Sequence, residues 1–146
     1  MSVFADAIDS FLGPIKDLLD DDKVSEVMIN GPFDIFVEKS GLVFKVENQF
    51  PNEDALISAM RAIAQSVGRV IDDENPRLDA RLPDGSRIAV VLPPMAKNGT
   101  TVAIRKFSKD DLTLSDLIKF GSMSKEGARF LDICIFLGKN VIVSGG

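Results

Sequence analysis

The residues with the clearest chemical meaning are the last seven, Asn140-Val-Ile-Val-Ser-Gly-Gly146. A buried strand that runs into a glycine turn is how a phosphate-binding P-loop begins, before the rest of G-x-x-x-x-G-K-[ST]. In this interpretation Ser144, Gly145 and Gly146 open the loop, and its lysine and hydroxyl residue would follow residue 146. The sequence then belongs to an ATPase interrupted just before its catalytic lysine. We expect the 146 residues themselves to be inactive and to bind nucleotide weakly, because most phosphate contacts come from the rest of that loop.

A second group of candidate residues is basic and lies at the ends of apolar strands. Arg87 and Arg105 occupy such positions, where the edge of a sheet would present them together. The simplest interpretation is that they form surface salt bridges with Asp79 or Asp84, each worth less than about 1 kcal/mol. The alternative is that they bind phosphate, since a guanidinium fork contacts two phosphate oxygens at once.

Composition excludes several other chemistries. The chain has no histidine, so it has no Ser-His or Cys-His nucleophile pair, and without a Cys/His cluster we expect no metal site. Its one cysteine, Cys134, falls in an apolar helical pattern and is expected in the core. A net charge of −5 argues against a nucleic-acid partner, and no apolar run is long enough for insertion into a membrane.

The elements that must position these residues follow from periodicity and turn signals. Apolar spacing predicts helices over 3–20 (interrupted at Gly13-Pro14), 53–67 (capped by Asn52), 112–120 (capped by Thr113 or Ser115) and 124–137 (capped by Ser124). Alternating and β-branched runs predict strands at 24–29, 35–37, 42–46, 77–82, 87–92, 101–105 and 141–143.

The order of these elements predicts two kinds of architecture. Residues 1–107 form an α+β domain, because hairpin-length connections make its sheet antiparallel. Residues 124–146 supply a helix and an apolar strand, the opening of a parallel α/β domain, and residues 108–123 serve as the linker.

Three segments together carry a resemblance: Asp79-Ala-Arg-Leu-Pro-Asp-Gly-Ser-Arg-Ile88, Pro93-Pro94 and Thr101-Val-Ala-Ile-Arg-Lys-Phe107. They closely resemble the type II/IV secretion ATPase family, and within it the CpaF-type motors of tight-adherence pili. Val24–Asn30 with Gly31-Pro32, Leu112-Thr-Leu114 and the P-loop opening agree in order, so that the resemblance spans residues 14–146.

The resemblance implies a PAS-like N-terminal domain joined to a RecA-like ATPase domain that uses ATP and Mg²⁺. It implies a homo-hexamer at the cytoplasmic side of a bacterial or archaeal inner membrane, docked on a platform protein. In that family, arginines of the N-terminal domain reach the terminal phosphate of ATP. The matching positions are Arg87 and Arg105, with Arg81 as a third candidate.

Two other functions remain open. The chain could be a free-standing PAS-like sensor or interaction module, which would contain an apolar ligand cavity. A Rossmann-type dinucleotide enzyme, with Ser144-Gly-Gly146 opening G-x-G-x-x-G, leaves the arginine-bearing segments unexplained and ranks last.

Overall fold

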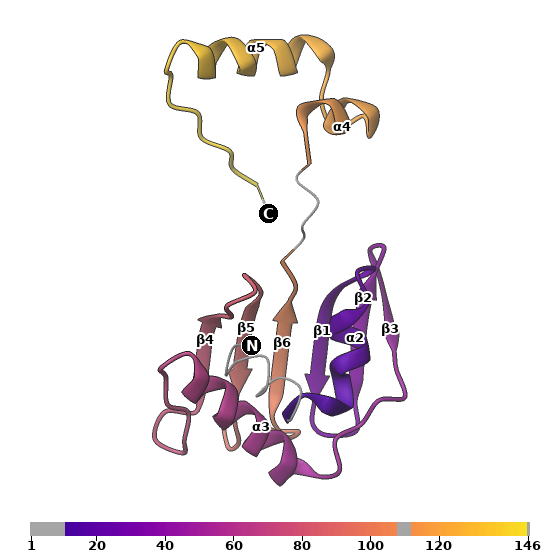
Figure 1. Ribbon diagram of the computed structural model, residues 1–146, viewed down its shortest axis with the longest axis vertical. Coiled ribbons are helices and arrows are strands. Elements are labelled where there is room, and N and C mark those ends of the chain that lie inside the picture. The colour runs from indigo at the N-terminus through magenta and orange to yellow at the C-terminus, as the bar shows by residue number, and fades with distance from the viewer. Residues whose placement is uncertain (1–10, 108–111, 146) are drawn as a thin grey trace. The chain divides into compact units, whose positions relative to one another are not determined.

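The computed structural model describes residues 11–107 and 112–145 (Figure 1). The chain divides into two compact units, Met1–Ser108 and Lys109–Gly146, and each is described by itself. The assignment of residues 108–123 to a linker stays a prediction, but part of that stretch is helical. Within the two described ranges, no helix is long and apolar enough to cross a membrane.

The first unit is built on a six-stranded antiparallel sheet, as the short connections predict. Its strand order is β3-β2-β1-β6-β5-β4, so that β6 joins the two halves of the sheet through β1 and β5. The α+β class with an antiparallel sheet is therefore confirmed, and the likeness to PAS domains stays a prediction. The strands are β1 (Val24–Asn30), β2 (Ile35–Lys39), β3 (Leu42–Lys45), β4 (Arg77–Arg81), β5 (Arg87–Val91) and β6 (Thr101–Arg105).

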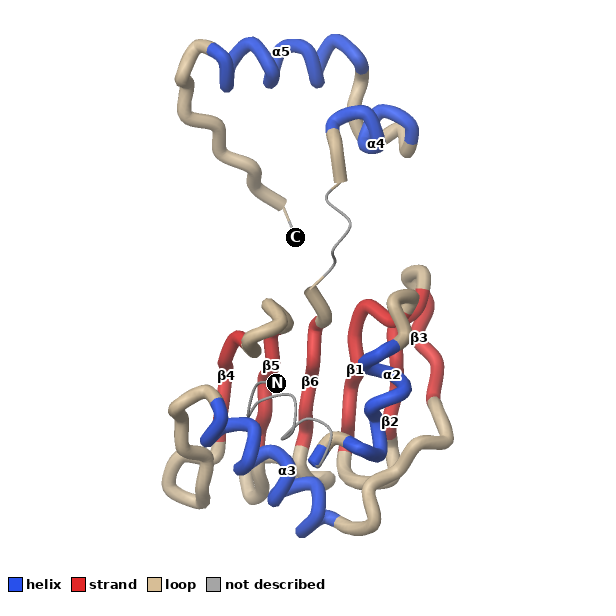
Figure 2. Tube along the Cα trace, viewed as in Figure 1, coloured by secondary structure: helices blue, strands red, loops and turns tan. Residues whose placement is uncertain are grey.

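Three helical segments of this unit cover one face of the sheet: η1 (Gly13–Ile15), α2 (Lys16–Asp20) and α3 (Glu53–Ser66) (Figure 2). The break predicted at Gly13-Pro14 is confirmed, since the proline sits in the first turn of η1. The remainder of the predicted helix, residues 3–10, lies outside the described residues. The predicted cap of α3 is also confirmed, because the side chain of Asn52 accepts from the backbone N–H of Ala55 at 2.8 Å.

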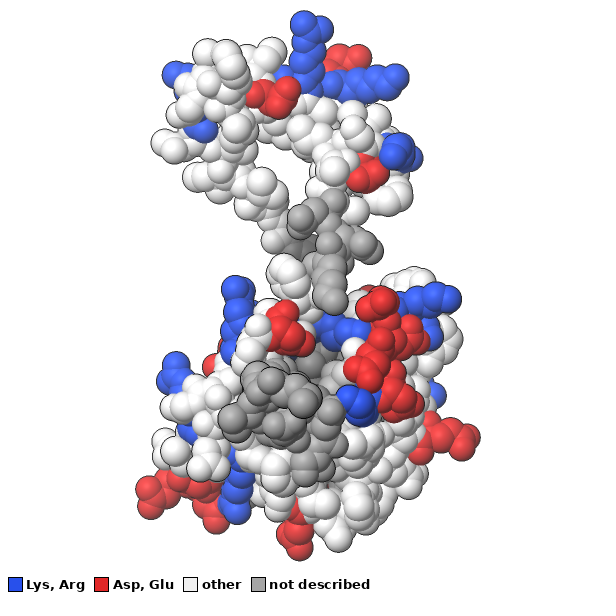
Figure 3. Space-filling model, viewed as in Figure 1, with Lys and Arg blue, Asp and Glu red and all other residues white. Residues whose placement is uncertain are grey.

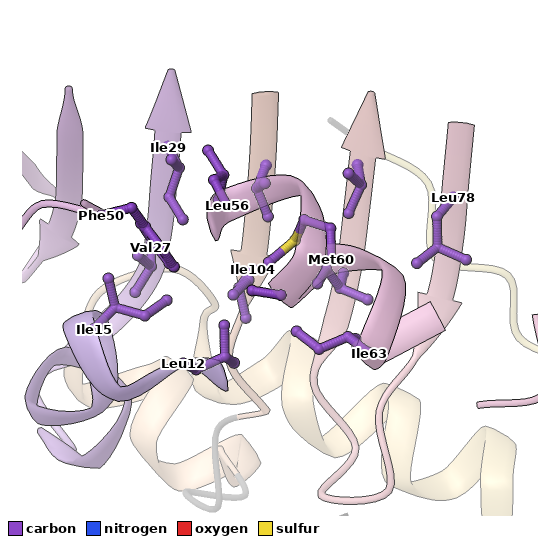
Figure 4. Packing of buried hydrophobic residues seen from close by; sticks show 14 of the residues in the cluster. Leu12, Ile15, Val27, Ile29, Phe50, Leu56, Met60, Ile63, Leu78 and Ile104 are labelled. Atoms are coloured by element: carbon purple, nitrogen blue, oxygen red, sulfur yellow. The ribbon is translucent and has the colours of Figure 1, made fainter. Parts of the chain in front are cut away.

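The core lies between the sheet and these helices (Figure 4). Leu56, Met60 and Ile63 recur at the helical period along α3 and are fully or almost fully buried. From the sheet side, Val27 and Ile104 project into the same cluster. Fully burying side chains of this size stabilises a fold by about 1.5–3 kcal/mol each, so this one-sided core fixes which face each strand residue takes.

Strand residues that alternate with the core residues point to the opposite face. No helix described in residues 11–107 covers that face, which we call the open face. On β4, β5, β6, β1 and β2, in that order, it carries Arg77, Asp79, Arg81, Arg87, Ala89, Val91, Thr101, Ala103, Arg105, Glu26, Met28, Asn30, Phe36 and Glu38.

The second unit contains two described helices, α4 (Leu114–Lys119) and α5 (Lys125–Phe136). Thr113 caps α4 through a reciprocal capping box with Asp116, which decides between the two predicted caps. Ser124 caps α5 as predicted, accepting from the N–H of Gly127 at 3.0 Å.

The predicted strand at residues 141–143 needs correction, since these residues carry no regular secondary structure. A strand is held by hydrogen bonds to a neighbouring strand. The described part of the second unit contains helices but no other strand for this segment to pair with. An apolar strand pattern cannot form a ladder without such a partner.

Candidate functional site

Three arginines lie side by side across three neighbouring strands. Arg81 at the end of β4 is directly opposite Arg87 at the start of β5, and Arg87 is directly opposite Arg105 at the end of β6. Directly opposite residues of antiparallel strands point to the same face, with Cβ atoms roughly 4.5–5.5 Å apart. All three arginines are exposed, and we call this set the arginine row.

The turn between β4 and β5 explains how two members of the row come together. Leu82–Ser86 reverses the chain, with Gly85 at φ +92° and its N–H donating to the carbonyl of Leu82 at 2.9 Å. Asp84 bonds within its own turn, as predicted, because its Oδ1 accepts from the N–H of Ser86 at 2.9 Å. The turn therefore fixes the register that places Arg81 opposite Arg87.

Ser86 has a role that the sequence analysis did not identify. Its side chain is buried; the hydroxyl donates to Asp84 at 2.9 Å and accepts from the backbone N–H of Phe107 at 3.2 Å. This contact ties the turn to the segment just after Arg105. The Asp-Gly-Ser-Arg pattern was the available signal, since a short hydroxyl side chain beside a turn commonly bonds backbone groups.

Arg87 is the one member of the row with a carboxylate partner among the described residues. Its Nε and Nη2 donate to the two oxygens of Asp79 at 2.9 and 2.6 Å. These hydrogen bonds, followed by the charge of the guanidinium, hold the pKa of Asp79 below its ordinary value of 3.8, and the same contacts raise the pKa of Arg87. The predicted surface salt bridge is thus confirmed for Arg87.

Arg81 and Arg105 differ in this respect. Across residues 11–107 and 112–145, neither has an ion pair within 4 Å, so the salt bridge expected for Arg105 with Asp79 or Asp84 is absent there. Like charges directly opposite each other in a sheet are destabilising. The row therefore holds three adjacent positive charges, of which only Arg87 is ion-paired among the described residues, although Glu26 lies directly opposite Arg105. An incoming anion would stabilise this arrangement.

Beyond Arg105, the residues that continue the arginine row onto β1 and β2 are acidic. Arg105 is directly opposite Glu26 on β1, and Glu26 is directly opposite Glu38 on β2. On the other, helix-covered face, Figure 3 shows acidic side chains gathered over α2. Within the open face, the three arginines therefore place positive charge on β4–β6, at one end of the strands, and the two glutamates place negative charge on β1 and β2.

The remaining predicted site residues belong to the second unit. Ser144 and Gly145 are exposed and lack regular structure, and Gly146 lies outside the described residues. The structure thus brings together Arg81, Arg87 and Arg105. Ser144 and Gly145 belong to the other unit, and their place at the start of a P-loop stays a prediction. In the part of the chain that is described, no group of acidic or cysteine side chains could hold a metal ion.

Comparison with known proteins identifies what this arrangement is similar to. A family model described as type II/IV secretion system protein matches residues 9–146. An uncharacterised protein of Methanocaldococcus jannaschii is 37% identical over 143 residues, covering 92% of this chain and 20% of that protein. The type IV secretion system protein VirB11 of Brucella suis is 37% identical over 120 residues, covering 80% of this chain and 33% of VirB11.

A solved structure matches in fold as well as sequence. The crystal structure of the VirB11 ATPase from the Brucella suis type IV secretion system, in complex with sulphate, is 34% identical and superposes with a TM-score of 0.69. The match covers 80% of this chain and 36% of that one. The chain therefore spans about a fifth to a third of the length of the proteins it matches.

Proposed function

Because this chain belongs to the type II/IV secretion system protein family, we propose that it is the N-terminal domain and the first ATPase-domain elements of a secretion or pilus motor. The whole enzyme would hydrolyse ATP with Mg²⁺ to drive protein export or pilus assembly, as a motor similar to the CpaF-type motors of tight-adherence pili. It would act as a homo-hexamer. The hexamer would dock on a platform protein at the cytoplasmic side of the inner membrane. The names of its VirB11 relatives support the secretion role.

The observation that carries the catalytic part of the proposal is the arginine row. Arg87 and Arg105 would contact the terminal phosphate of ATP held by the P-loop that Ser144 and Gly145 begin, with Arg81 as a third contact. Phosphoryl transfer depends on positioning and on stabilising negative charge, which paired guanidinium groups supply. A tetrahedral anion is also what the relative's crystal structure contains, as sulphate.

Placing these arginines on a separate domain would make hydrolysis depend on domain closure. In the open state the phosphates would meet only the P-loop and its metal ion. On closing, the arginine row would complete the site and stabilise the charge of the transition state. Closure would thereby couple ATP hydrolysis to movement of the N-terminal domain.

The structure offers little support for a free-standing sensor. A sensor of that kind needs an enclosed apolar cavity for its ligand. The surface depression beside β3 is open to solvent and is lined by Lys45, Val46, Glu47 and Gln49. Its mixed and charged lining does not favour an apolar ligand.

The experiment that tests the proposal is Arg105→Ala and Arg87→Ala in the full-length protein, with ATP hydrolysis as the readout. Each substitution should lower kcat by roughly 10³-fold, as the loss of a phosphate-contacting arginine does. Arg77→Ala is the matched control, because Arg77 is exposed on the same open face at the other end of β4. If Arg105→Ala leaves kcat unchanged, and a thermal melt shows that the variant is folded, the proposed phosphate contact of Arg105 is refuted.

A further inference from the structure

Asp79 binds Arg87 along one particular edge of the guanidinium group. A guanidinium has a side edge, formed by Nε and Nη2, and an end edge, formed by Nη1 and Nη2. The two hydrogen bonds to Asp79, from Nε at 2.9 Å and from Nη2 at 2.6 Å, both lie on the side edge. Each edge presents two parallel N–H groups that match the spacing of oxygens in a carboxylate or phosphate.

The end edge of Arg87 remains available. Its Nη1 donates to no group within the described residues, and Nη2 keeps a second N–H beyond the one given to Asp79. The Arg87 side chain is 68% exposed, so an anion can approach that edge from solvent. Asp79 therefore does not compete with a phosphate for the same pair of donors.

The sheet makes this side-on contact possible through register and residue size. Asp79 on β4 is opposite Ala89 rather than Arg87, so the ion pair runs diagonally between neighbouring rows of the open face. The position after Ala89 along the same row is Ala103 on β6. Diagonal neighbours are within reach of a long side chain, and the small side chain of Ala89, opposite Asp79, leaves room for the Arg87 side chain to reach it.

Arg81 and Arg105 provide the contrast within the same row. Neither has an ion-pair partner in the described residues, so no carboxylate there holds either guanidinium in one rotamer. Arg87 alone is held by two hydrogen bonds to one carboxylate. The three arginines are thus alike in position but unequal in their freedom to move.

We propose that Asp79 is a positioning residue, which holds Arg87 by its side edge so that the end edge is presented to the terminal phosphate. This rests on the proposed phosphate contact of Arg87. Asp79 itself would touch neither nucleotide nor metal ion. Its effect is to reduce the conformational freedom that Arg87 would otherwise lose when the transition state forms.

The kinetic test is Asp79→Asn in the full-length ATPase, alone and combined with Arg87→Ala. Alone it should lower kcat by about fivefold, the size that a surface ion pair supports. KM should not rise, because the substitution also removes a negative charge near the phosphates. In the Arg87→Ala background Asp79→Asn should change nothing further, since there is no longer an arginine to position.

Two further variants separate positioning from general damage. Asp79→Glu should recover part of the lost rate, because a longer carboxylate still reaches the guanidinium. Asp73→Asn is the matched control, since Asp73 forms a surface pair with Arg61 at 3.6 Å in the same unit. It should leave kcat unchanged.

The outcomes distinguish this inference from the proposed function. If Arg87→Ala leaves kcat unchanged, the phosphate contact of Arg87 falls, and the role of Asp79 with it. If Arg87→Ala lowers kcat but Asp79→Asn does not, or lowers it equally in both backgrounds, only the positioning role is overturned.

A spectroscopic measurement on the 146-residue chain tests the geometry without any activity. The Nη resonances of Arg87 in ¹⁵N NMR should be separate, because two bonds to Asp79 slow rotation about the Nε–Cζ bond. In Asp79→Asn they should average into one. Averaged resonances in the unsubstituted chain would overturn the inference.

Discussion

The backbone N–H of Phe107 donates to the hydroxyl of Ser86 at 3.2 Å, which joins the β4–β5 turn to the residue that follows β6 by two positions. Phe107 also packs its ring against Gly85, the central glycine of that turn. The turn that follows Arg81 and the segment that follows Arg105 are therefore held together at one end of the sheet by Phe107. A substitution in this turn should therefore shift the positions of both Arg87 and Arg105.

The packing of Gly85 on Phe107 predicts a difference between two glycine substitutions. Gly85→Ala would place a Cβ 3.1 Å from Cγ of Phe107, in addition to adopting an unfavourable φ of +92°. Gly41→Ala is the control, because φ is +76° but nothing lies within 4 Å. We expect Gly41→Ala to cost about 1–2 kcal/mol and Gly85→Ala about 1 kcal/mol more, by urea unfolding. Equal losses of unfolding free energy in the two variants would mean that the Phe107 ring moves aside without a measurable penalty.

Glu53 is predicted to stabilise the loop before β6. Its Oε1 accepts from both the N–H and the hydroxyl of Thr100, each at 2.6 Å, and Thr100 is fully buried. Glu53→Ala should lower the free energy of unfolding by roughly 2–3 kcal/mol, because buried donors lose a charged acceptor. Asp54→Ala, which removes an exposed acid from the same first turn of α3, should cost less than about 1 kcal/mol. A comparable loss in both would assign the effect to the helix dipole instead.

The Asp79–Arg87 pair predicts a pH dependence. The pKa of Asp79 is lowered in the folded chain, so the stability that the pair contributes is present above the unfolded pKa and is lost as pH falls through the folded one. A ¹³C NMR titration of the Asp79 carboxyl should show a midpoint below 3.8. In Arg87→Ala the midpoint should move up, because the hydrogen bonds and the positive charge are gone. An identical midpoint in both chains would show that the pair is not formed in solution.

The second unit is predicted to make the 146-residue chain self-associate. Phe136 is 89% exposed and Ile142 is 92% exposed, and several other apolar side chains of this unit are also exposed. Contiguous exposed apolar surface drives association. Light scattering over a dilution series should show a falling mass, and Phe136→Ser with Ile142→Ser should weaken the association. Phe33→Ser, at an exposed phenylalanine of the first unit, should not; a monodisperse monomer at all concentrations would refute the prediction.

Much of the fold could be predicted from the sequence, because periodicity reports burial directly. The spacing of Leu56, Met60 and Ile63 identified α3 and its core face, and Asn52 marked its start. Alternation and turn residues located all six strands of the sheet to within two residues. The failure at residues 141–143 has a physical cause, since a strand also needs a partner that local pattern does not reveal.

The site was only partly predictable, for a related reason. Residue types and strand ends pointed to Arg87 and Arg105, but their direct opposition depends on the register of β5 against β6. Register is a property of two strands and their turn, so it cannot be read from either strand alone. The side-on binding of Arg87 by Asp79 was one of two salt bridges that the sequence allowed, and only the geometry selects it.

The line of directly opposite residues on the open face is positive at the three arginines and negative at Glu26 and Glu38. The electric field of this face is therefore directed across its strands. A diffusing anion would be drawn toward β4–β6 and repelled from β1–β2 before it makes any contact, which raises the rate of productive encounters. Such long-range guidance acts over about 10 Å in 0.1 M salt and fades as ionic strength rises. A phosphate-bearing ligand would therefore be oriented by the charges of the sheet before it reached the arginine row.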